Sequence, residues 1–269
     1  MDFESLLQIL VTAITQGITE FLPISSSGHL FFINELFFWK DINLTLMVAA
    51  HLGTLFAVIN YFWKDCKKYF FLGALETFSK KKTFKFNIFL NLFYSSIPII
   101  IFGTFLKLYN INYIYHSWVI ALSAIIFSLL LFFSDKNKTK KKLNNISFRD
   151  ALIIGIFQIF SLIPGSSRTG LCITAARFLG FNRICATKYS MYLSIPAISG
   201  ATFLMFIDIV KKNSFFLWIE VISVFFLSFL FAYFTISFFL KLLKKINFNF
   251  FVIYRILVAI FFLIFLDFF

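Results

Sequence analysis

Long apolar runs separated by short polar segments dominate the chain. A helix needs about 20 mostly apolar residues to cross a hydrocarbon core about 30 Å thick. The pattern predicts six such spans, at residues 44–63, 86–106, 113–133, 186–210, 216–240 and 249–267. Because the runs do not alternate in polarity, they do not match transmembrane β-strands. The chain is therefore expected to be an all-α polytopic membrane protein.

Two other regions are apolar but interrupted, and each is too broken to form a span. Residues 6–38 and 150–182 both read as a helix, a break rich in Pro, Gly and Ser, and a second short helix. Irregular backbone is tolerated at membrane depth only where it lines a cavity enclosed by protein. Each region is therefore predicted to be a re-entrant helical hairpin.

Basic residues set the predicted orientation of the spans. Loops 64–85, 134–149 and 241–248 carry sixteen Lys and Arg residues, against four lysines on the opposite side. The positive-inside rule therefore places these three loops in the cytoplasm. Each half then has one hairpin and three spans, so the second half is inverted relative to the first. Within a single membrane domain, 1–269, the predicted repeats are 1–133 and 148–269.

Composition supports this assignment and narrows the functional classes. The chain has 60% hydrophobic and 14% charged residues, which is too little charge for the surface of a soluble domain. Its net charge of +13 is assigned to topology and to contact with anionic lipid, and no nucleic-acid partner is expected. The three cysteines show no metal-ligand spacing.

The break in the first hairpin carries groups suited to catalysis. Gln16 and Glu20 are four residues apart and share a helix face just before Pro23, which ends that helix. Ser26 and His29 follow, one helical turn apart. A hydroxyl, an imidazole and a carboxylate suit a nucleophile, an acid-base group and an orienting or metal-binding group. The alternative is that the serines cap a helix and His29 is a core histidine.

The break in the second hairpin carries groups suited to an anion. Gly165 allows close backbone approach, Ser166 and Ser167 add hydroxyl donors, and the next helix presents its positive N-terminal end. Arg168 adds a planar, permanently charged donor that suits phosphate. An arginine at this depth costs at least about 2.5 kcal/mol unless a charged group compensates it. The alternative partner is Glu20, in a structural ion pair.

The two breaks resemble the motifs of the undecaprenyl pyrophosphate phosphatase family, which is linked to bacitracin resistance. One family motif is Glu or Gln, three residues, Glu and Phe-Leu-Pro, followed by a serine-rich Gly-His, and it matches residues 16–29. The other is Pro-Gly-x-Ser-Arg-Ser-x-x-Thr, and it matches residues 164–172. The resemblance extends over essentially the whole chain. Thr169 replaces the motif Ser, and Cys172, a weaker donor, replaces the motif Thr; Thr174 is a candidate substitute.

The resemblance implies hydrolysis of undecaprenyl diphosphate to the monophosphate and inorganic phosphate, which recycles a lipid carrier for cell-wall synthesis in the bacterial inner membrane. The implied catalytic residues are Glu20, Ser26, His29 and Arg168. The groups expected to hold phosphate are Ser25, Ser27, Gly165, Ser166, Ser167, Arg168 and Thr169. A divalent cation, Mg²⁺ or Ca²⁺, is expected at Glu20 with Gln16.

Several alternatives remain open at this point. A lipid-phosphate transporter could use the same midplane site, because inverted repeats with broken helices are common among transporters. His29 rather than Ser26 could be the nucleophile, and a homodimer is compatible with the sequence. A second class of lipid phosphatase shares Ser27-Gly28-His29, but its other motifs do not follow Ser167-Arg168. His51, His116 and Arg255 are expected to have structural roles, and Arg255 is expected to snorkel or to pair with a carboxylate. The alternative for His51 is that it lines the cavity, because the segment His51-Leu52-Gly53-Thr54 also resembles the family.

Overall fold

The computed structural model describes residues 3–39, 44–79, 83–109, 116–137, 141–211 and 218–267. Within these ranges the regular structure is helical, apart from one isolated bridge between Lys141 and Phe181. The helices are α1 (Phe3–Thr19), α2 (Ser26–Leu36), α3 (Leu44–Tyr61), α4 (Trp63–Cys66), α5 (Leu72–Leu75), α6 (Phe84–Leu108), α7 (Ser117–Asp135), α8 (Phe148–Ile159), α9 (Arg168–Phe178), α10 (Arg183–Lys211), α11 (Trp218–Leu242) and α12 (Asn249–Asp267). A π-helical turn, Lys67–Phe71, joins α4 to α5, and short 3₁₀ turns occur at Glu76–Phe78, Leu143–Asn145 and Phe160–Leu162.

Five of these helices, α3, α6, α7, α10 and α11, are long and apolar enough to cross a membrane. They match five of the predicted spans and confirm a multi-pass helical membrane protein. The sixth predicted span falls on α12, whose apolar part, Asn249–Ile264, is shorter than 18 residues. That span therefore stays a prediction.

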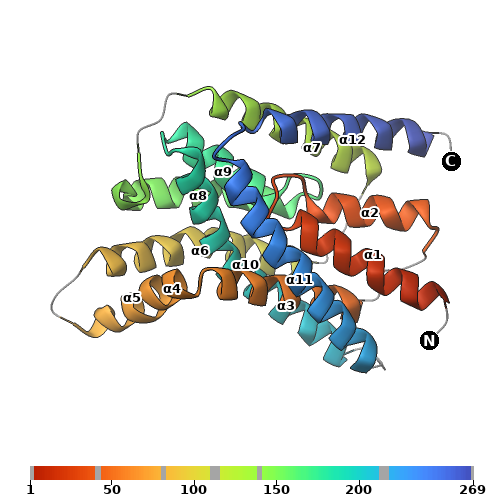
Figure 1. Ribbon diagram of the computed structural model, residues 1–269, viewed down its shortest axis with the longest axis horizontal. Helices are drawn as coiled ribbons and strands as arrows, with labels where there is room; N and C mark the ends of the chain where they lie inside the picture. The colour runs from red at the N-terminus through yellow and green to blue at the C-terminus, as the bar shows by residue number, and fades with distance from the viewer. Residues whose placement is uncertain are drawn as a thin grey trace.

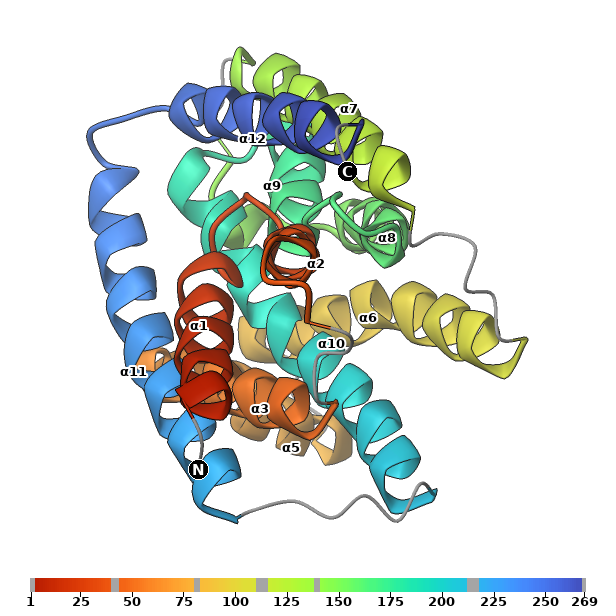
Figure 2. The ribbon, with the colours of Figure 1, turned by 90° about the vertical axis from the view of Figure 1, so that its right-hand side faces the viewer.

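The interrupted regions form two helical hairpins, α1–α2 and α8–α9, that approach each other from opposite ends of the molecule (Figure 1). Their turns meet in its centre. Helices α7 and α12 lie side by side across one flank, and α3, α6, α10 and α11 form the other (Figures 1 and 2). The two turns are thus enclosed by protein.

Glycine lets the long helices pack closely around the hairpins. A Cβ atom on Gly53 of α3 would lie 2.3 Å from the Phe225 carbonyl oxygen of α11, and one on Gly155 of α8 would lie 2.6 Å from the Ser95 carbonyl oxygen of α6. Such distances exclude any side chain. Small residues at helix contacts are typical of membrane bundles, where close backbone approach replaces the hydrophobic driving force.

The segment predicted as the loop 64–85 is largely helical. Helices α4 and α5 and the π-turn between them fold back on α6, with Tyr69 buried against the rings of Phe84 and Tyr192. At the turn, the Thr83 hydroxyl donates to the Glu76 carboxylate at 2.7 Å, which lowers the pKa of that carboxyl. Hydrophobic contacts with the helix bundle stabilise this segment as helix, although its lysine-rich sequence favours a loop.

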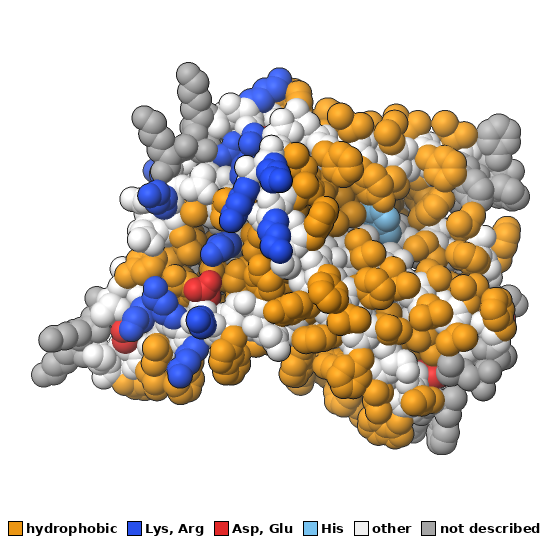
Figure 3. Space-filling view, in the orientation of Figure 1, with side chains coloured by type: hydrophobic (Ala, Val, Ile, Leu, Met, Phe, Trp, Pro, Cys, Tyr) orange, Lys and Arg blue, Asp and Glu red, His pale blue; other side chains and the backbone are white. Residues whose placement is uncertain are grey.

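Parts of the segments that carried the orientation argument lie outside the described residues. These are residues 40–43, 80–82, 138–140 and 212–217. On the face shown in Figure 3, the described Lys and Arg side chains gather at the end that holds α4, α5 and the start of α8, and hydrophobic side chains cover much of the remainder.

Candidate active site

Both hairpin turns end in the same way, on a serine with left-handed backbone. Ser25 has φ 73° and Ser167 has φ 67°, and each is the N-cap of the helix that follows. Each serine hydroxyl accepts a hydrogen bond from the amide three residues on, at Gly28 and at Gly170. The first amides of a helix have no partner within it and carry partial positive charge. Two helix ends of this kind, from α2 and α9, are therefore brought to one place.

A cavity of about 210 Å³ lies where these helix ends meet. Its walls come from both hairpins and from α3, α6 and α10. The lining residues are Glu20, Ser25, Ser26, Ser27, His51, Ile99, Ser161, Leu162, Ser167, Arg168, Ala197, Ile198 and Ala201. The wall from α6 and α10 is apolar, whereas the wall from the two turns is polar.

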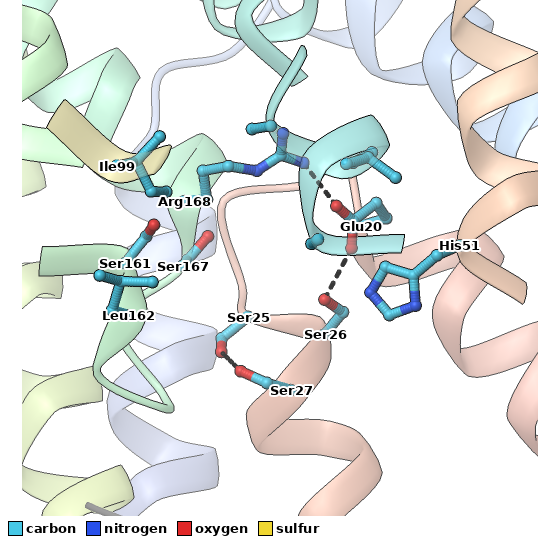
Figure 4. A pocket seen from close by; sticks show the side chains of 13 residues that line it. Glu20, Ser25, Ser26, Ser27, His51, Ile99, Ser161, Leu162, Ser167 and Arg168 are labelled. Carbon is cyan, nitrogen blue, oxygen red and sulfur yellow. Dashed lines mark hydrogen bonds and ion pairs between the residues drawn. The ribbon is translucent and has the colours of Figure 1, made fainter. Parts of the chain in front are cut away.

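The Glu20 carboxylate links the two turns across this cavity (Figure 4). Its Oε1 accepts from Arg168 Nη2 at 2.5 Å, and its Oε2 accepts from Ser26 Oγ and from Gln16 Nε2, both at 2.8 Å. The Thr169 hydroxyl donates to the Glu20 backbone carbonyl at 3.0 Å. Ser26 and Arg168, from different hairpins, thus bind opposite oxygens of one carboxylate.

This cluster leaves two buried polar atoms without a partner. One is Nη1 of Arg168, a charged donor, and the other is Oε1 of Gln16, an acceptor. A buried polar atom without a hydrogen bond costs about 1–3 kcal/mol, so the unpaired donor of Arg168, a residue that lines the cavity, indicates a ligand. Gln16 is fully buried beside Glu20 and is not among the lining residues. Arg168 therefore pairs with Glu20, as in the structural alternative, and keeps a donor for a further oxygen.

His29 is the predicted catalytic residue that the structure places elsewhere. Its Nδ1 lies 2.7 Å from the Ser25 carbonyl oxygen and its Nε2 lies 2.8 Å from the Tyr254 hydroxyl. It lines a separate cavity of about 30 Å³, with Gly165 and Arg255 among its neighbours. Both ring nitrogens are engaged, and neither is bonded to Ser26.

The imidazole that does line the main cavity is His51 of α3. Its ring lies beside Ser26 and Glu20 in Figure 4, and its Nδ1 is 2.8 Å from the Met47 carbonyl oxygen. Since a carbonyl only accepts, Nδ1 carries the proton and Nε2 is left for other partners. The structural role expected for His51 is therefore incomplete. The available signal was its place in the His-Leu-Gly-Thr segment, but sequence does not show which way an α3 side chain faces.

The other residues predicted to hold phosphate divide into two groups. Ser25, Ser27 and Ser167 line the cavity, whereas Gly165, Ser166 and Thr169 do not. Ser166 donates to the Ile163 carbonyl at 2.7 Å within its own turn. These three shape the turn rather than face the cavity.

Cys172 and Thr174 lie away from the cavity. The Cys172 thiol donates to Gln158 Oε1 at 3.3 Å and is 1% exposed. Thr174, the expected substitute for the motif threonine, donates to the Gly170 carbonyl at 2.7 Å and is also buried. The expectation that Thr174 replaces a phosphate contact is therefore wrong, because its hydroxyl is used within α9.

The predicted cation ligands fit a divalent ion in type. Glu20 and Gln16 offer hard oxygen donors, and the buried unpaired Gln16 Oε1 supplies the acceptor that such an ion requires. The described residues contain no group of three or more His, Cys, Asp or Glu side chains able to hold a metal by themselves. An ion here would therefore share ligands with a bound phosphate, which is the usual form of a Mg²⁺ site.

A multi-span helical bundle that encloses two capped helix ends, an arginine and a carboxylate-bound serine has the features of a membrane-embedded phosphate site. Comparison with known families agrees with this class. The chain belongs to the family of the bacitracin resistance protein BacA, whose family model matches residues 9–261.

Curated relatives resemble the chain along almost its full length. It is 39% identical over 261 residues to a protein of Pelagibacter ubique named undecaprenyl-diphosphatase, with 96% of each chain covered. It is 36% identical over 263 residues to undecaprenyl-diphosphatase 1 of Pseudoalteromonas translucida, covering 97% of this chain and 99% of that one. A third, from Hahella chejuensis and also named undecaprenyl-diphosphatase, is 37% identical over 258 residues, covering 94% and 95%.

Proposed function

We propose that this protein is an undecaprenyl-diphosphatase that hydrolyses undecaprenyl diphosphate to undecaprenyl phosphate and inorganic phosphate. The observation that carries the proposal is the Glu20 carboxylate, which binds the Ser26 hydroxyl on one oxygen and Arg168 on the other. Nucleophile, base and phosphate anchor are thereby joined in one cavity. The names and coverage of the relatives support the same substrate.

In the first step, Ser26 Oγ attacks the terminal phosphorus of the diphosphate. Glu20 Oε2, already 2.8 Å from that hydroxyl, accepts its proton as the Oγ–P bond forms. The bond between this phosphorus and the bridging oxygen breaks, and the oxygen leaves on undecaprenyl phosphate. The product is a phosphoserine at residue 26.

In the second step, water attacks the phosphorus of the phosphoserine. As the Oγ–P bond breaks, Glu20 returns to Ser26 Oγ the proton that it accepted in the first step, which restores the Ser26 hydroxyl and the Glu20 carboxylate. The water oxygen forms the new bond to phosphorus, and both water protons leave with inorganic phosphate. Arg168 Nη1 and the first amides of α2 and α9 donate to the phosphate oxygens. Donors that are fixed before the reaction stabilise the charge of the transition state most effectively.

The geometry favours Ser26 over His29 as the nucleophile. Ser26 lines the same cavity as Arg168, whereas both ring nitrogens of His29 are hydrogen-bonded and its ring lines the smaller cavity behind the turns. An attacking nitrogen needs a free lone pair directed at phosphorus. His51, which faces the main cavity, is the imidazole better placed to contact a phosphate oxygen.

A divalent cation would be held by Glu20 and Gln16 together with oxygens of the diphosphate. When bound, it supplies positive charge that offsets the charge developing on those oxygens. Gln16 contributes Oε1, its unpaired atom, and its Nε2 keeps the Glu20 carboxylate oriented at 2.8 Å.

We also propose how the chain is arranged in the inner membrane. Helix α12 is a sixth span, and the pairs α1–α2 and α8–α9 are re-entrant hairpins. The second half of the chain is inverted relative to the first, and the lysine-rich loops lie in the cytoplasm. Three corresponding pairs of helices match in length and support the repeat: α2 and α9 have 11 residues each, α6 and α11 have 25, and α7 and α12 have 19. The pairs α1 and α8, with 17 and 12 residues, and α3 and α10, with 18 and 29, differ. The polyprenyl tail would pass the apolar wall of α6 and α10 into the lipid.

The decisive experiment compares hydrolysis with transport. Purified protein in detergent, supplied with undecaprenyl diphosphate, is expected to release inorganic phosphate. Failure to release phosphate, together with movement of the lipid across liposomes, would overturn the proposal in favour of a carrier. A carrier has no need of a serine hydroxyl bonded to a carboxylate beside its phosphate anchor, so the transporter alternative is not favoured.

A further inference from the structure

Arg255 of α12 lies directly behind the two turns. Its side chain is fully enclosed, with 2% of the residue exposed. Nη2 donates to the carbonyl oxygens of Gly165 at 3.0 Å and Ser166 at 2.9 Å, and Nη1 donates to that of Pro23 at 3.4 Å. One guanidinium thus binds the backbone of both hairpins, which the sequence expectation of a snorkelling or carboxylate-paired arginine did not foresee.

The charge of Arg255 is compensated in an unusual way. Among the described residues no carboxylate lies within ion-pair distance of it, and its hydrogen-bond partners are backbone carbonyls. Burying a guanidinium without a counter-ion is costly, so a purely structural tie at this position would be expected to use a neutral donor. The planar guanidinium group carries several N–H donors, so it reaches carbonyls on two separate turns at once.

The carbonyls that Arg255 holds come just before the two left-handed serines. Pro23 precedes Ser25 by two residues, and Gly165 and Ser166 precede Ser167. These carbonyls are bound to Arg255 of α12, and the cap serines that follow them line the main cavity. Gly165 itself has φ +88°, and a Cβ there would lie 2.2 Å from the Ile120 carbonyl, so this turn cannot relax around another side chain.

Tyr254, the residue before Arg255 on α12, contacts His29 of the first hairpin. Its hydroxyl lies 2.8 Å from His29 Nε2, and the two rings are stacked 5.7 Å apart at an angle of 7°. His29 Nδ1 is paired with the Ser25 carbonyl. His29 therefore connects α12 to the cap serine of α2.

We propose that Tyr254 and Arg255 are positioning residues, and that α12 uses them to fix the distance between Ser26 on one hairpin and Arg168 on the other. Neither residue lines the main cavity, so neither is placed to contact a diphosphate bound there. Arg255 sets how far apart the turns lie, and Tyr254 acts through His29 on the turn that carries Ser26. His29 thus serves the reaction from behind the nucleophile.

The test of Arg255 uses a second buried arginine as its control. Arg177 is 3% exposed and also donates to backbone carbonyls, at Phe181 and Asp135, but it lies at the far end of α9 from the cavity. Unlike Arg255, it also has a carboxylate partner, Asp135, at 3.0 Å. Arg255→Lys and Arg177→Lys are expected to lower the melting temperature alike. Arg255→Lys alone is expected to reduce kcat, by about 10- to 100-fold with KM little changed, since small misplacements of reacting groups cost that much.

Tyr254→Phe removes one hydroxyl and tests the proposal even if Arg255→Lys does not fold. It is expected to lower kcat by up to about tenfold with KM little changed. Tyr233→Phe, a ring-stacked tyrosine of α11 away from both cavities, is the control and should leave kcat unchanged. The proposal is wrong if Arg255→Lys and Tyr254→Phe keep the wild-type kcat, or if Arg177→Lys loses as much kcat as Arg255→Lys.

This inference rests on the function proposed above, and the two can fail separately. Wild-type protein that releases no phosphate from the lipid diphosphate contradicts the function itself. Active wild-type protein with unaffected Arg255 and Tyr254 variants contradicts only the positioning role.

Discussion

Ser25 and Ser167 make the same turn in the two halves of the chain. Both have left-handed backbone, with φ of 73° and 67°, and both cap the next helix by accepting from a glycine amide three residues on. A residue with a side chain rarely adopts this conformation. The shared strain places the first turns of α2 and α9 at one cavity, where a phosphate is expected to bind.

Substitutions of Ser25 and Ser167 are predicted to distinguish two contributions to stability, the cost of the left-handed backbone and the gain from the capping hydrogen bond. Ser25→Ala or Ser167→Ala keeps the strained backbone and loses the cap, so each should destabilise the protein by about 1 kcal/mol. Ser25→Gly or Ser167→Gly loses the cap but relieves the strain, and each should be nearly neutral. Thermal unfolding in detergent measures the order of stability among these variants. Glycine variants as unstable as the alanine variants would show that the left-handed backbone carries no cost.

The same pair shows where sequence reasoning reaches its limit. Superposing the motifs on their prolines pairs Ser25 with Ser166, whereas the structure pairs Ser25 with Ser167. Gln16 and Gln158 lie seven and six residues before their prolines, Pro23 and Pro164, but each lies nine residues before its cap serine. Sequence could not reveal this because left-handed backbone usually signals glycine, and here serine adopts it.

Five of the spans and the proximity of Gln16, Glu20 and Ser26 were predictable for a simple reason. Span length is a property of local composition, and Gln16, Glu20 and Ser26 surround one helix break, so their proximity follows from sequence. The orientations of His29, His51 and Arg255 depend on packing between distant helices. Those residues were therefore assigned to the wrong surroundings or left without a functional role.

Removing the negative charge of Glu20 is predicted to improve binding and abolish turnover. In Glu20→Gln, measured in EDTA so that no divalent cation contributes, Arg168 loses its internal partner and becomes fully available to phosphate, so inorganic pyrophosphate should bind about tenfold more tightly. Hydrolysis should be lost because no base remains for Ser26. Titration calorimetry measures the first effect and phosphate release the second.

Two further variants serve as controls for Glu20→Gln. Glu35→Gln, at an exposed position on α2, should change neither binding nor turnover, whereas Arg168→Gln should weaken pyrophosphate binding. If Glu20→Gln weakens binding as Arg168→Gln does, the carboxylate does not compete with phosphate for the arginine.

The cation proposal predicts a specific effect of Gln16. Chelation with EDTA should abolish activity and added Mg²⁺ should restore it. Gln16→Leu should raise the Mg²⁺ concentration needed for half-maximal activity by about 10-fold or more. Gln158→Leu is the matched control, because that glutamine is equally buried but contacts Cys172 instead of Glu20. Full activity in EDTA would contradict the cation site.

Cys172→Thr restores the residue type of the family motif and is predicted to leave kcat and KM unchanged. The side chain faces Gln158 within the protein and does not line the cavity. A hydroxyl is a better donor than a thiol, so stability should change by no more than about 1 kcal/mol. A marked gain in activity in steady-state assays would show that this position contacts the substrate.

We propose that Ser26 attacks the terminal phosphorus with Glu20 as its base. The most direct measurement is single-turnover phosphate release by Ser26→Ala, with binding of the lipid diphosphate measured in parallel and Ser223→Ala, on α11 and outside the cavity, as the control. We expect a loss of about 1000-fold or more in Ser26→Ala with binding retained, and near wild-type release in Ser223→Ala. Wild-type release by Ser26→Ala would contradict it.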